Sequence, residues 1–344
     1  MEKIRRIFYS LLVFVFSGCF SAGIPANSFS LVSWNVQTFF DGNKDGTEYS
    51  NFQKSQDWGE AAYKKRLEKL CAAINSINAD IFVFEEIENS GILYDISNFL
   101  ASKSWNSRKN WNYGAFSKNP GDSIGCAVLS KFPISKVTVH NLDVRTENSV
   151  QPSMRPLMKV EILFEGKIFC IFANHWKSKS GGAEESEIWR NWQETLLVKK
   201  FIEQQEIPSV ACGDFNRDIS EFKRNSCASG NENGKSAPEH GNLQNIELRS
   251  TVGNSSAENM NVAVHSPWLD ESGFLEEPGS YYYNENWERI DHFFSNSKAA
   301  VKDFEVLTEG EWCGENFIPK PYRIYTGEGF SDHLPIKCTV GARF

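Results

Sequence analysis

The sequence lacks an excess of basic residues, because its 36 Lys and Arg are outnumbered by 44 Asp and Glu, for a net charge of −8. A protein that coats nucleic acid through bulk electrostatics needs the opposite balance, so this class is disfavoured. An enzyme that acts on phosphodiesters stays open, because a bound metal ion reverses the charge of its site. The balance of 40% hydrophobic and 23% charged residues excludes a fully disordered or collagen-like chain.

The sequence also lacks CxxC pairs, internal repeats and breaks in composition. An odd number of cysteines follows Cys19, so neither a zinc site nor a complete disulfide framework is indicated. Beyond the N-terminus no apolar run approaches about 18 residues, so we expect no membrane span in the mature protein. We expect a single domain over residues 19–344. The stretch 222–265, rich in Asn, Ser, Gly and Glu, is predicted to be a surface insertion.

The N-terminus is typical of an export signal. Basic residues at positions 3–6 precede an apolar stretch at 7–16 that is shorter than the roughly 20 residues of a membrane span. Ser17-Gly18-Cys19 then resembles the end of a bacterial lipobox, in which the cysteine is lipidated and starts the mature chain. We therefore expect residues 1–18 to be a signal peptide of the lipoprotein type, Cys19 to be lipidated, and the protein to lie in the cell envelope. Plain cleavage near residues 21–23, giving a periplasmic or secreted protein, is the alternative.

Short apolar, β-rich runs recur along the rest of the chain. The predicted strands are Ser30–Val36, Ile81–Glu86, Gly125–Ser130, Val137–Asn141, Met158–Phe164, Lys167–Asn174, Ser209–Gly213, Arg289–Ser295, Asp303–Leu307 and Pro335–Val340. Glu165-Gly166 is a turn signal that predicts an antiparallel hairpin from the two strands beside it. Apolar residues at helical spacing predict helices over Glu60–Ile77 and Glu187–Gln204.

Polar residues gather at the ends of several predicted strands. Taken singly, each is most simply a turn or a strand cap, but together they offer oxygen ligands for a hard cation and histidines suited to phosphate chemistry. Such a site favours Mg²⁺ or Mn²⁺ over zinc. The residues concerned are Asn35, Glu85 and Glu86, Asn174 and His175, Asp214 and Asn216, Asp291 and His292, and Asp332 and His333.

These residues lie in motifs that resemble a known family. SWNVQTFFD, DIFVFEEIEN, GCAVLSKFPI, NHWKSKSGG, GDFNRD, RIDHFF and SDHLPI occur in the order of the endonuclease/exonuclease/phosphatase superfamily, which has the DNase-I-like fold. The resemblance runs from about Ser30 to Val340, and NHWKSKSGG followed by a helix containing Arg190 is most similar to the secreted bacterial nuclease branch. It implies an α/β fold of four layers, in which two mainly antiparallel β-sheets pack face to face and are flanked by helices.

The resemblance also implies roles for the polar residues. Glu86 matches the metal-binding acid, with Asn35 beside it and Asp332 as a further ligand. The cofactor is then Mg²⁺, with Mn²⁺ as an alternative and Ca²⁺ as a structural or supporting ion. Asp214 and Asn216 match the pair that orients and activates the attacking water.

The histidines take the remaining roles. His333 matches the histidine that pairs with a buried aspartate, here Asp291. His175 matches the histidine that stabilises the transition state or protonates the leaving oxygen, and which of the two is the acid stays open. Asp122 is one candidate partner for His175, and a missing partner is the other.

Substrate contacts are predicted at Arg155, which lies in SMRPLMKV, and at residues close to His175 in the sequence. Arg155 contacts phosphate or forms a surface salt bridge, and the other candidates are Asn174, Lys177, Lys179 and Arg190.

We therefore expect an exported, Mg²⁺-dependent nuclease that hydrolyses DNA or RNA and works as a monomer without an obligate protein partner. Contact with a membrane is expected only through the lipid anchor. A phospholipase C, a sphingomyelinase or another phosphoesterase of the same fold is the alternative. The aromatic residues 281–283 and Trp287 indicate either membrane contact or a strand with one buried face. A non-catalytic surface lipoprotein is disfavoured, because every catalytic position holds a competent residue type.

Overall fold

The computed structural model describes residues 27–103, 110–145, 150–224, 246–249, 262–269 and 278–343. The predicted signal peptide at 1–18 and the predicted lipidation site Cys19 lie outside the described residues. In the described part of the chain, no helix is both long enough and apolar enough to cross a bilayer.

A first β-sheet contains six strands among the described residues. They are β1 (Ser28–Phe39), β2 (Ile81–Ile87), β3 (Tyr113–Ser117), β4 (Gly125–Ser130), β15 (Ala299–Val306) and β16 (Ile336–Ala342). Their spatial order is β15-β16-β1-β2-β4-β3. Only the β1–β2 pair is parallel, and the other four neighbouring pairs are antiparallel.

A second sheet contains eight strands within the same ranges. They are β5 (Ile134–His140), β6 (Leu157–Phe164), β7 (Lys167–His175), β8 (Ser209–Asp214), β9 (Lys223–Arg224), β10 (Ile246–Arg249), β11 (Val262–His265) and β14 (Asp291–Ser295). Their order is β5-β6-β7-β8-β14-β11-β10-β9. The predicted hairpin is confirmed, since β6 and β7 pair antiparallel about Glu165-Gly166, and both turn residues have positive φ.

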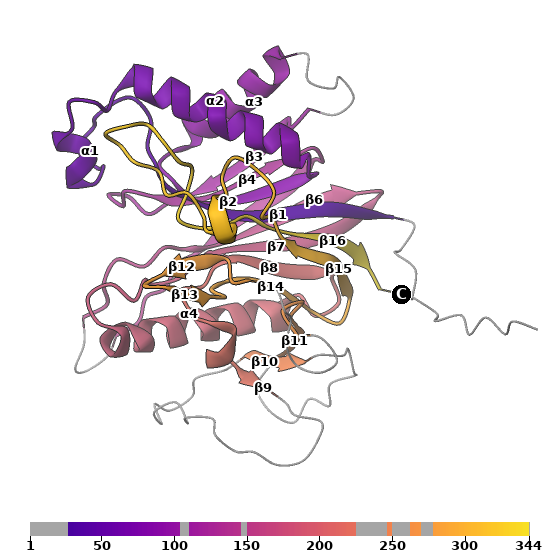
Figure 1. Cartoon of the computed structure of the whole chain (residues 1–344). Coiled ribbons are helices and arrows are strands. Elements are labelled where there is room, and N and C mark those ends of the chain that lie inside the picture. The colour runs from indigo at the N-terminus through magenta and orange to yellow at the C-terminus, as the bar shows by residue number, and fades with distance from the viewer. Residues whose placement is uncertain are drawn as a thin grey trace, which may run out of the picture.

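Helices cover the outer faces of the two sheets. They are α1 (Ser50–Lys54), α2 (Glu60–Ile77), α3 (Ser90–Ser102) and α4 (Ala183–Glu203). Helices α2 and α3 lie over the first sheet and α4 lies under the second, so the chain forms the four layers expected from the sequence (Figure 1). The predicted α/β sandwich with two mainly antiparallel sheets is therefore confirmed.

The hydrophobic core fills the space between the sheets. Phe29 of β1 meets Phe164 of β6 and Phe169 of β7, with ring centroids 5.2 Å apart in both contacts. These edge-to-face contacts join the two sheets at the end of the sandwich where β1 begins. Removing such a buried phenylalanine costs about 3–5 kcal/mol, so the packing holds the sheets in a fixed relation.

Some elements differ from the sequence predictions. Helix α4 begins at Ala183 rather than Glu187. Helix α3 was missed because its start, Asn89-Ser90-Gly91, has the composition of a turn. In the structure the Asn89 side chain instead caps the helix by accepting a hydrogen bond from the Gly91 N–H.

The described parts of the predicted surface insertion at 222–265 contain three strands. Strands β9, β10 and β11 extend the second sheet beyond β14. Ile246, Leu248 and Val264 of these strands are buried, so the apolar residues scattered in this stretch serve to build a sheet edge. Residues 225–245 and 250–261 lie outside the described part of the chain.

Candidate active site

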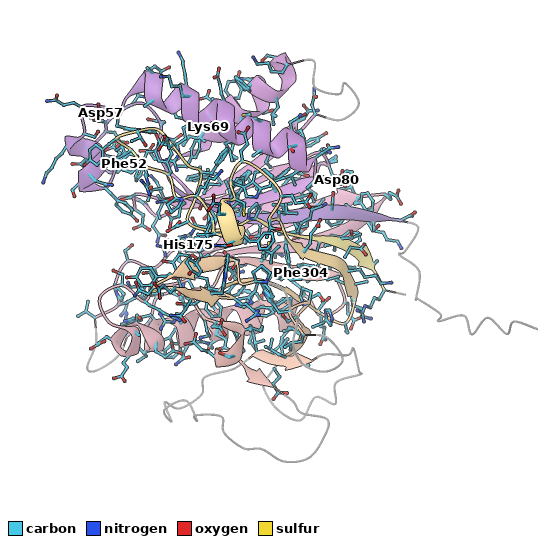
Figure 2. All side chains as sticks on the ribbon, in the orientation of Figure 1. Phe52, Asp57, Lys69, Asp80, His175 and Phe304 are labelled. Carbon is cyan, nitrogen blue, oxygen red and sulfur yellow. The ribbon has the colours of Figure 1, made fainter. Side chains whose placement is uncertain are left out.

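A cavity of about 560 Å³ opens at one end of the sandwich, where the central strands of both sheets finish. Strands β1 and β2 run parallel in one sheet, and β7 and β8 run parallel in the other. Their final residues therefore meet at one end, and β14 begins there with Asp291 opposite Asp214. The cavity is lined by Asn35, Tyr49, Glu86, Arg155, His175, Ser178, Lys179, Ser180, Asp214, Asn216, Tyr281, Tyr283, Glu288, Ile290, Asp332 and His333. Figure 2 shows His175 at the level where the two halves of the molecule meet.

A β-bulge turns Glu86 into this cavity. The register of β2 shifts between Glu85 and Ile87 against both of its neighbours, and Glu86 has φ 68°. The bulge breaks the alternation of the strand, so Glu85 is fully buried while Glu86 reaches the cavity. Arg66 of α2 holds the matching bulge in β1 by donating to the carbonyls of residues 36, 37 and 38.

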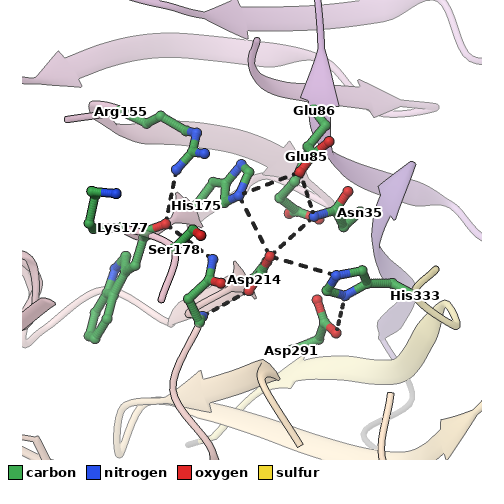
Figure 3. Close-up of polar contacts among 12 residues, drawn as sticks. Asn35, Glu85, Glu86, Arg155, His175, Lys177, Ser178, Asp214, Asp291 and His333 are labelled. Atoms are coloured by element: carbon green, nitrogen blue, oxygen red, sulfur yellow. Dashed lines mark hydrogen bonds and ion pairs between the residues drawn. The ribbon is translucent and has the colours of Figure 1, made fainter. Parts of the chain in front are cut away.

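The Asp214 carboxylate lies between two histidine side chains (Figure 3). Its Oδ2 is 3.6 Å from Nε2 of His175 and 3.9 Å from Nε2 of His333, and it accepts a hydrogen bond of 3.1 Å from Asn35. Burial raises the pKa of Asp214 to about 7, against the opposing attraction of His333. A carboxylate with this pKa can accept a proton from water more readily than an ordinary aspartate.

His333 forms the predicted pair with Asp291. Its Nδ1 is 2.9 Å from Oδ2 of Asp291, and both side chains are buried. Burial alone lowers the pKa of His333, but the Asp291 charge and hydrogen bond and the Asp214 charge together raise it well above its ordinary value. The imidazole is therefore held in its charged form, with Nε2–H directed toward Asp214.

His175 has the opposite environment. Burial, followed by the positive charges of Arg155 and His333, lowers the pKa of His175 well below its ordinary value, so the ring is neutral. Among the described residues its Nδ1 has no hydrogen-bond partner. Asp122, one of the two candidate partners, instead accepts a hydrogen bond from Ser153. The described residues thus favour the alternative in which His175 has no partner.

The predicted metal ligands form an oxygen-rich group beside the histidines. Glu86 Oε1 accepts from Asn35 at 3.3 Å, and Glu86 Oε2 accepts from the Thr38 N–H at 2.5 Å. Burial raises the pKa of Glu86, and the nearby Asp332 carboxylate raises it further. Two carboxylates that share a cavity and repel one another suit a divalent cation, and a donor set of carboxylate and amide oxygens fits Mg²⁺ or Mn²⁺.

The Asn35 side chain links the predicted metal ligand Glu86 to Asp214. It donates to both Glu86 and Asp214, while its Oδ1 accepts from the Gln37 N–H at 2.9 Å. Asn216 holds Asp214 from the other side, since its N–H donates to Asp214 Oδ1 at 2.8 Å. These two contacts leave Asp214 Oδ2 facing the histidines.

A second acidic cluster lies outside the cavity. Ligand-type atoms of Asp45, Glu48 and Glu88 lie within 4.8 Å of one another. The buried Glu48 and Glu88 carboxylates already accept hydrogen bonds from the backbone N–H groups of Asp41, Asp45 and Gly46. The cluster alone therefore does not indicate an ion, and a supporting Ca²⁺ stays a prediction.

Two of the five predicted substrate contacts line the cavity. Arg155 is half-buried and donates to the Trp176 carbonyl at 2.9 Å. Lys179 pairs with Glu288 at 3.2 Å and with Glu221 at 3.4 Å. Lys177 is half-buried beside this region but does not line the cavity.

The other two predicted contacts, Asn174 and Arg190, do not line the cavity. Arg190 is 1% exposed and donates to Glu187, to Ser186 and to two carbonyls, so its guanidinium holds the start of α4 rather than phosphate. Asn174 is buried, donates to the carbonyls of Phe172 and Cys212, and accepts from Trp176. Neither side chain has a free polar group with which to bind a substrate.

The sequence did not predict where several further residues lie relative to the cavity. Glu85 lies beneath the cavity with Ser33 as its hydrogen-bond donor, and burial raises its pKa well above the ordinary value. Arg217 anchors the loop after Asp214 through Glu194 and Glu187, both at 2.5 Å. Tyr281 and Tyr283 form part of the cavity wall. An apolar strand that ends in two acids, and an arginine directly after Asp214-Phe215-Asn216, are weak signals that other sequences share.

Comparisons with known proteins agree with this architecture. A model of the Endonuclease/Exonuclease/phosphatase family matches residues 32–333. A structure of D. rerio TDP2 complexed with single strand DNA product has 15% sequence identity and a TM-score of 0.53, covering 91% of this chain and 99% of that one. The human Nocturnin catalytic domain with bound sulfate anion has 16% identity and a TM-score of 0.54, covering 92% and 95%.

A third similar structure is an endonuclease/exonuclease/phosphatase from Beutenbergia cavernae, with 14% identity, a TM-score of 0.53, and coverage of 92% of this chain and 72% of that one. At these identities the similarities establish the fold alone. No curated protein matches the sequence.

Proposed function

The chain belongs to the endonuclease/exonuclease/phosphatase family, and on that basis we propose that it is a divalent-metal-dependent phosphodiesterase whose substrate is nucleic acid. Members of this family are hydrolytic phosphoesterases. The observation that carries the proposal is the position of the Asp214 carboxylate, 3.6 Å from His175 and 3.9 Å from His333, in a cavity that also contains Glu86 and Asp332.

Glu86 and Asp332 are the residues that would hold the metal ion, with Asn35 orienting Glu86. A bound divalent cation would polarise the phosphate and offset the negative charge that develops on it.

Asp214 acts as the general base in this proposal. The attacking water gives its proton to Asp214 Oδ2 as its oxygen bonds to phosphorus, and the bond from phosphorus to the leaving oxygen breaks. The Asn216 N–H fixes Oδ1 of the carboxylate, so Oδ2 is the oxygen that faces the water. Fixing the base in this way lowers the entropic cost of the attack.

His333 supplies the proton for the leaving oxygen. Its Nδ1 is held by Asp291, so the proton available for transfer is on Nε2. After the reaction Asp214 can return its proton to His333 across 3.9 Å, which restores the starting state. His175 is the neutral partner that hydrogen-bonds a nonbridging phosphate oxygen. The sequence left open which of the two histidines is the acid, and in this proposal it is His333.

Arg155 and Lys179 supply the positive charge for binding an acidic substrate, because they line the cavity of a chain that is acidic overall. The D. rerio TDP2 structure with its single strand DNA product makes single-stranded nucleic acid the first substrate to test. The deciding experiment compares plasmid, single-stranded DNA, RNA, sphingomyelin and inositol phosphates as substrates, each with Mg²⁺ and with EDTA. We expect hydrolysis of DNA or RNA that EDTA abolishes.

A phospholipase C or sphingomyelinase activity is the second candidate, because the cavity wall includes Tyr283, an aromatic side chain that is 57% exposed. The same set of substrates decides between the two. Hydrolysis of sphingomyelin without hydrolysis of nucleic acid would establish the second candidate.

We also propose that the protein is exported and anchored by a lipid on Cys19. The basic start, the short apolar stretch and Ser17-Gly18-Cys19 support this proposal. Anchoring requires more than one acyl chain, since a single chain gives only weak membrane binding. Mass spectrometry of the mature protein tests it: a lipidated Cys19 N-terminus is expected, and an unmodified N-terminus beyond Cys19 contradicts it.

A further inference from the structure

A short hairpin places two tyrosine rings in the wall of the cavity. Strands β12 (Tyr281–Tyr283) and β13 (Asn286–Glu288) pair antiparallel and lie beside the second sheet (Figure 1). Tyr281 and Tyr283 are two residues apart on one strand, so both side chains point to the same face. Their rings are nearly parallel, 13° apart, with centroids separated by 6.1 Å.

The two tyrosine rings lie in line with the imidazole ring of His333. The Tyr281 ring centroid is 4.7 Å from that of the His333 imidazole, with the planes tilted by 35°. A row of flat groups therefore runs from His333 through Tyr281 to Tyr283. Its outer member, Tyr283, is 57% exposed, whereas Tyr281 is half-buried.

The hairpin is held in place from several sides. Asn284 and Glu285 at its turn both have positive φ, as a tight two-residue connection requires. On the opposite face Tyr282 packs against Trp287, with ring centroids 5.0 Å apart. The Leu334 N–H donates to the Ser280 carbonyl at 2.7 Å, which ties the hairpin to the segment carrying His333. The exposed ring is therefore positioned before any ligand arrives.

The hairpin does not have the composition expected of a membrane-inserting element. Its tip, Asn284-Glu285-Asn286, is polar and acidic, and Glu288 follows on the returning strand. Such a tip is unfavourable in a bilayer and is repelled by anionic lipids. The same charges disfavour a phosphate backbone running over the hairpin, so the exposed ring suits a neutral aromatic group attached to a phosphate held deeper in the cavity.

We propose that Tyr283, supported by Tyr281, stacks on one unpaired nucleobase next to the scissile phosphate, so that the enzyme prefers single-stranded nucleic acid. Aromatic side chains bind bases in this way without sequence preference, because every base has a flat face. A base inside a duplex is stacked on both sides and cannot reach the ring. This inference rests on the proposed nuclease function and adds the strand preference to it.

The kinetic test compares Tyr283→Ala with Tyr283→Phe on a single-stranded oligonucleotide and on a duplex of the same sequence. Removing one base–aromatic contact should raise KM for the single strand about 5- to 150-fold. Tyr283→Phe keeps the ring and should change KM by less than about twofold. Tyr94→Ala is the matched control, because Tyr94 is 70% exposed but does not line the cavity. An unchanged KM in Tyr283→Ala would overturn the inference.

A binding test separates this inference from the proposed function. Single-stranded oligonucleotides carrying 2-aminopurine at successive positions are mixed with the protein in EDTA, so that no turnover is needed. Quenching at one position, lost in Tyr283→Ala and retained in Tyr283→Phe, supports the stacking.

Three other outcomes are informative. A wild-type protein that cleaves nucleic acid but shows no position-specific quenching contradicts the stacking alone. A protein that cleaves neither DNA nor RNA contradicts the proposed function. Loss of binding to phosphatidylcholine–sphingomyelin vesicles in Tyr283→Ala, with KM for the oligonucleotide unchanged, overturns the inference in favour of a membrane role.

Discussion

His333 Nδ1 and Asp291 Oδ2 are 2.9 Å apart, and this contact joins the segment before β16 to the first residue of β14. The two strands belong to different sheets. The pair therefore links the halves of the sandwich at the cavity, and it directs Nε2 of the imidazole toward Asp214.

Removing the negative charge of Asp291 should lower the rate of catalysis. Asp291→Asn should lower kcat by about 10²–10⁴-fold, because His333 loses both its charged form and the hydrogen bond that fixes its tautomer. Steady-state kinetics on an oligonucleotide measures this change. Glu305→Gln is a suitable control, since Glu305 is an exposed acid paired with Lys337 on the first sheet. Equal kcat values for Asp291→Asn and Glu305→Gln would rule out a catalytic role for the pair.

Glu86→Gln should weaken metal binding while leaving the fold intact. The amide keeps the size of the side chain and can still accept from the Thr38 N–H, but it removes the charge that attracts a cation. Wild-type protein should unfold at a higher temperature with Mg²⁺ than with EDTA, because a ligand that binds only the folded state stabilises it. This difference should shrink in the variant, and an undiminished difference together with full activity at low Mg²⁺ would show that Glu86 is not the metal acid.

The sequence indicated which polar residues lie together where their positions depend on strand ends. Asp214 and His175 end neighbouring parallel strands, so an apolar run followed by a polar residue was enough to bring them together. It predicted the direction of side chains less well. Arg190 lies on a weakly amphipathic helix, and only the tertiary structure shows that its guanidinium faces inward to Glu187 and Ser186.

Local backbone features account for the other differences. The bulge that turns Glu86 into the cavity and Glu85 into the core has no clear mark in the sequence Phe84-Glu85-Glu86. The proximity of the tyrosine hairpin to His333 depends on a contact between Ser280 and Leu334, which are far apart in the chain. Neither feature follows from periodicity.

Because His292 is buried, we expect acid to destabilise the protein. Burial lowers the pKa of His292 to about 4, while its ordinary value is 6.5. Below pH 6.5 the unfolded chain takes up a proton that the folded chain does not, so stability present above pH 6.5 is lost as the pH falls toward 4. Between pH 7 and pH 5 the loss from this group is about 2 kcal/mol.

Urea unfolding of His292→Gln measures this contribution. The fall in unfolding free energy from pH 7 to pH 5 should be smaller in the variant by about that amount, whatever its stability at pH 7. His265, whose pKa burial also lowers to about 4, contributes equally in both proteins and cancels in the comparison. An identical fall in the two proteins would mean that His292 is not held neutral.

The buried ion pairs of Arg217 should be important for stability. Arg217 is 2% exposed and bonds to Glu194, Glu187 and Asn191 of α4. Arg217→Gln leaves the buried Glu194 without its partner, which typically costs about 3–5 kcal/mol. Lys64→Gln, which breaks the exposed pair with Glu60, should change the free energy of unfolding far less, because water already screens that pair. Equal losses in chemical unfolding would contradict the importance of the buried network.

In the proposed mechanism Asp214, between His175 and His333, is the general base for metal-dependent hydrolysis of nucleic acid. The most direct test is the initial rate of cleavage of a labelled single-stranded oligonucleotide in Mg²⁺ by wild-type protein and by Asp214→Asn. We predict measurable cleavage by the wild type, its loss in EDTA, and a rate about 10²–10⁴-fold lower in the variant. Cleavage at equal rates by the two proteins, or hydrolysis of sphingomyelin or inositol phosphates but not of nucleic acid, would contradict this mechanism.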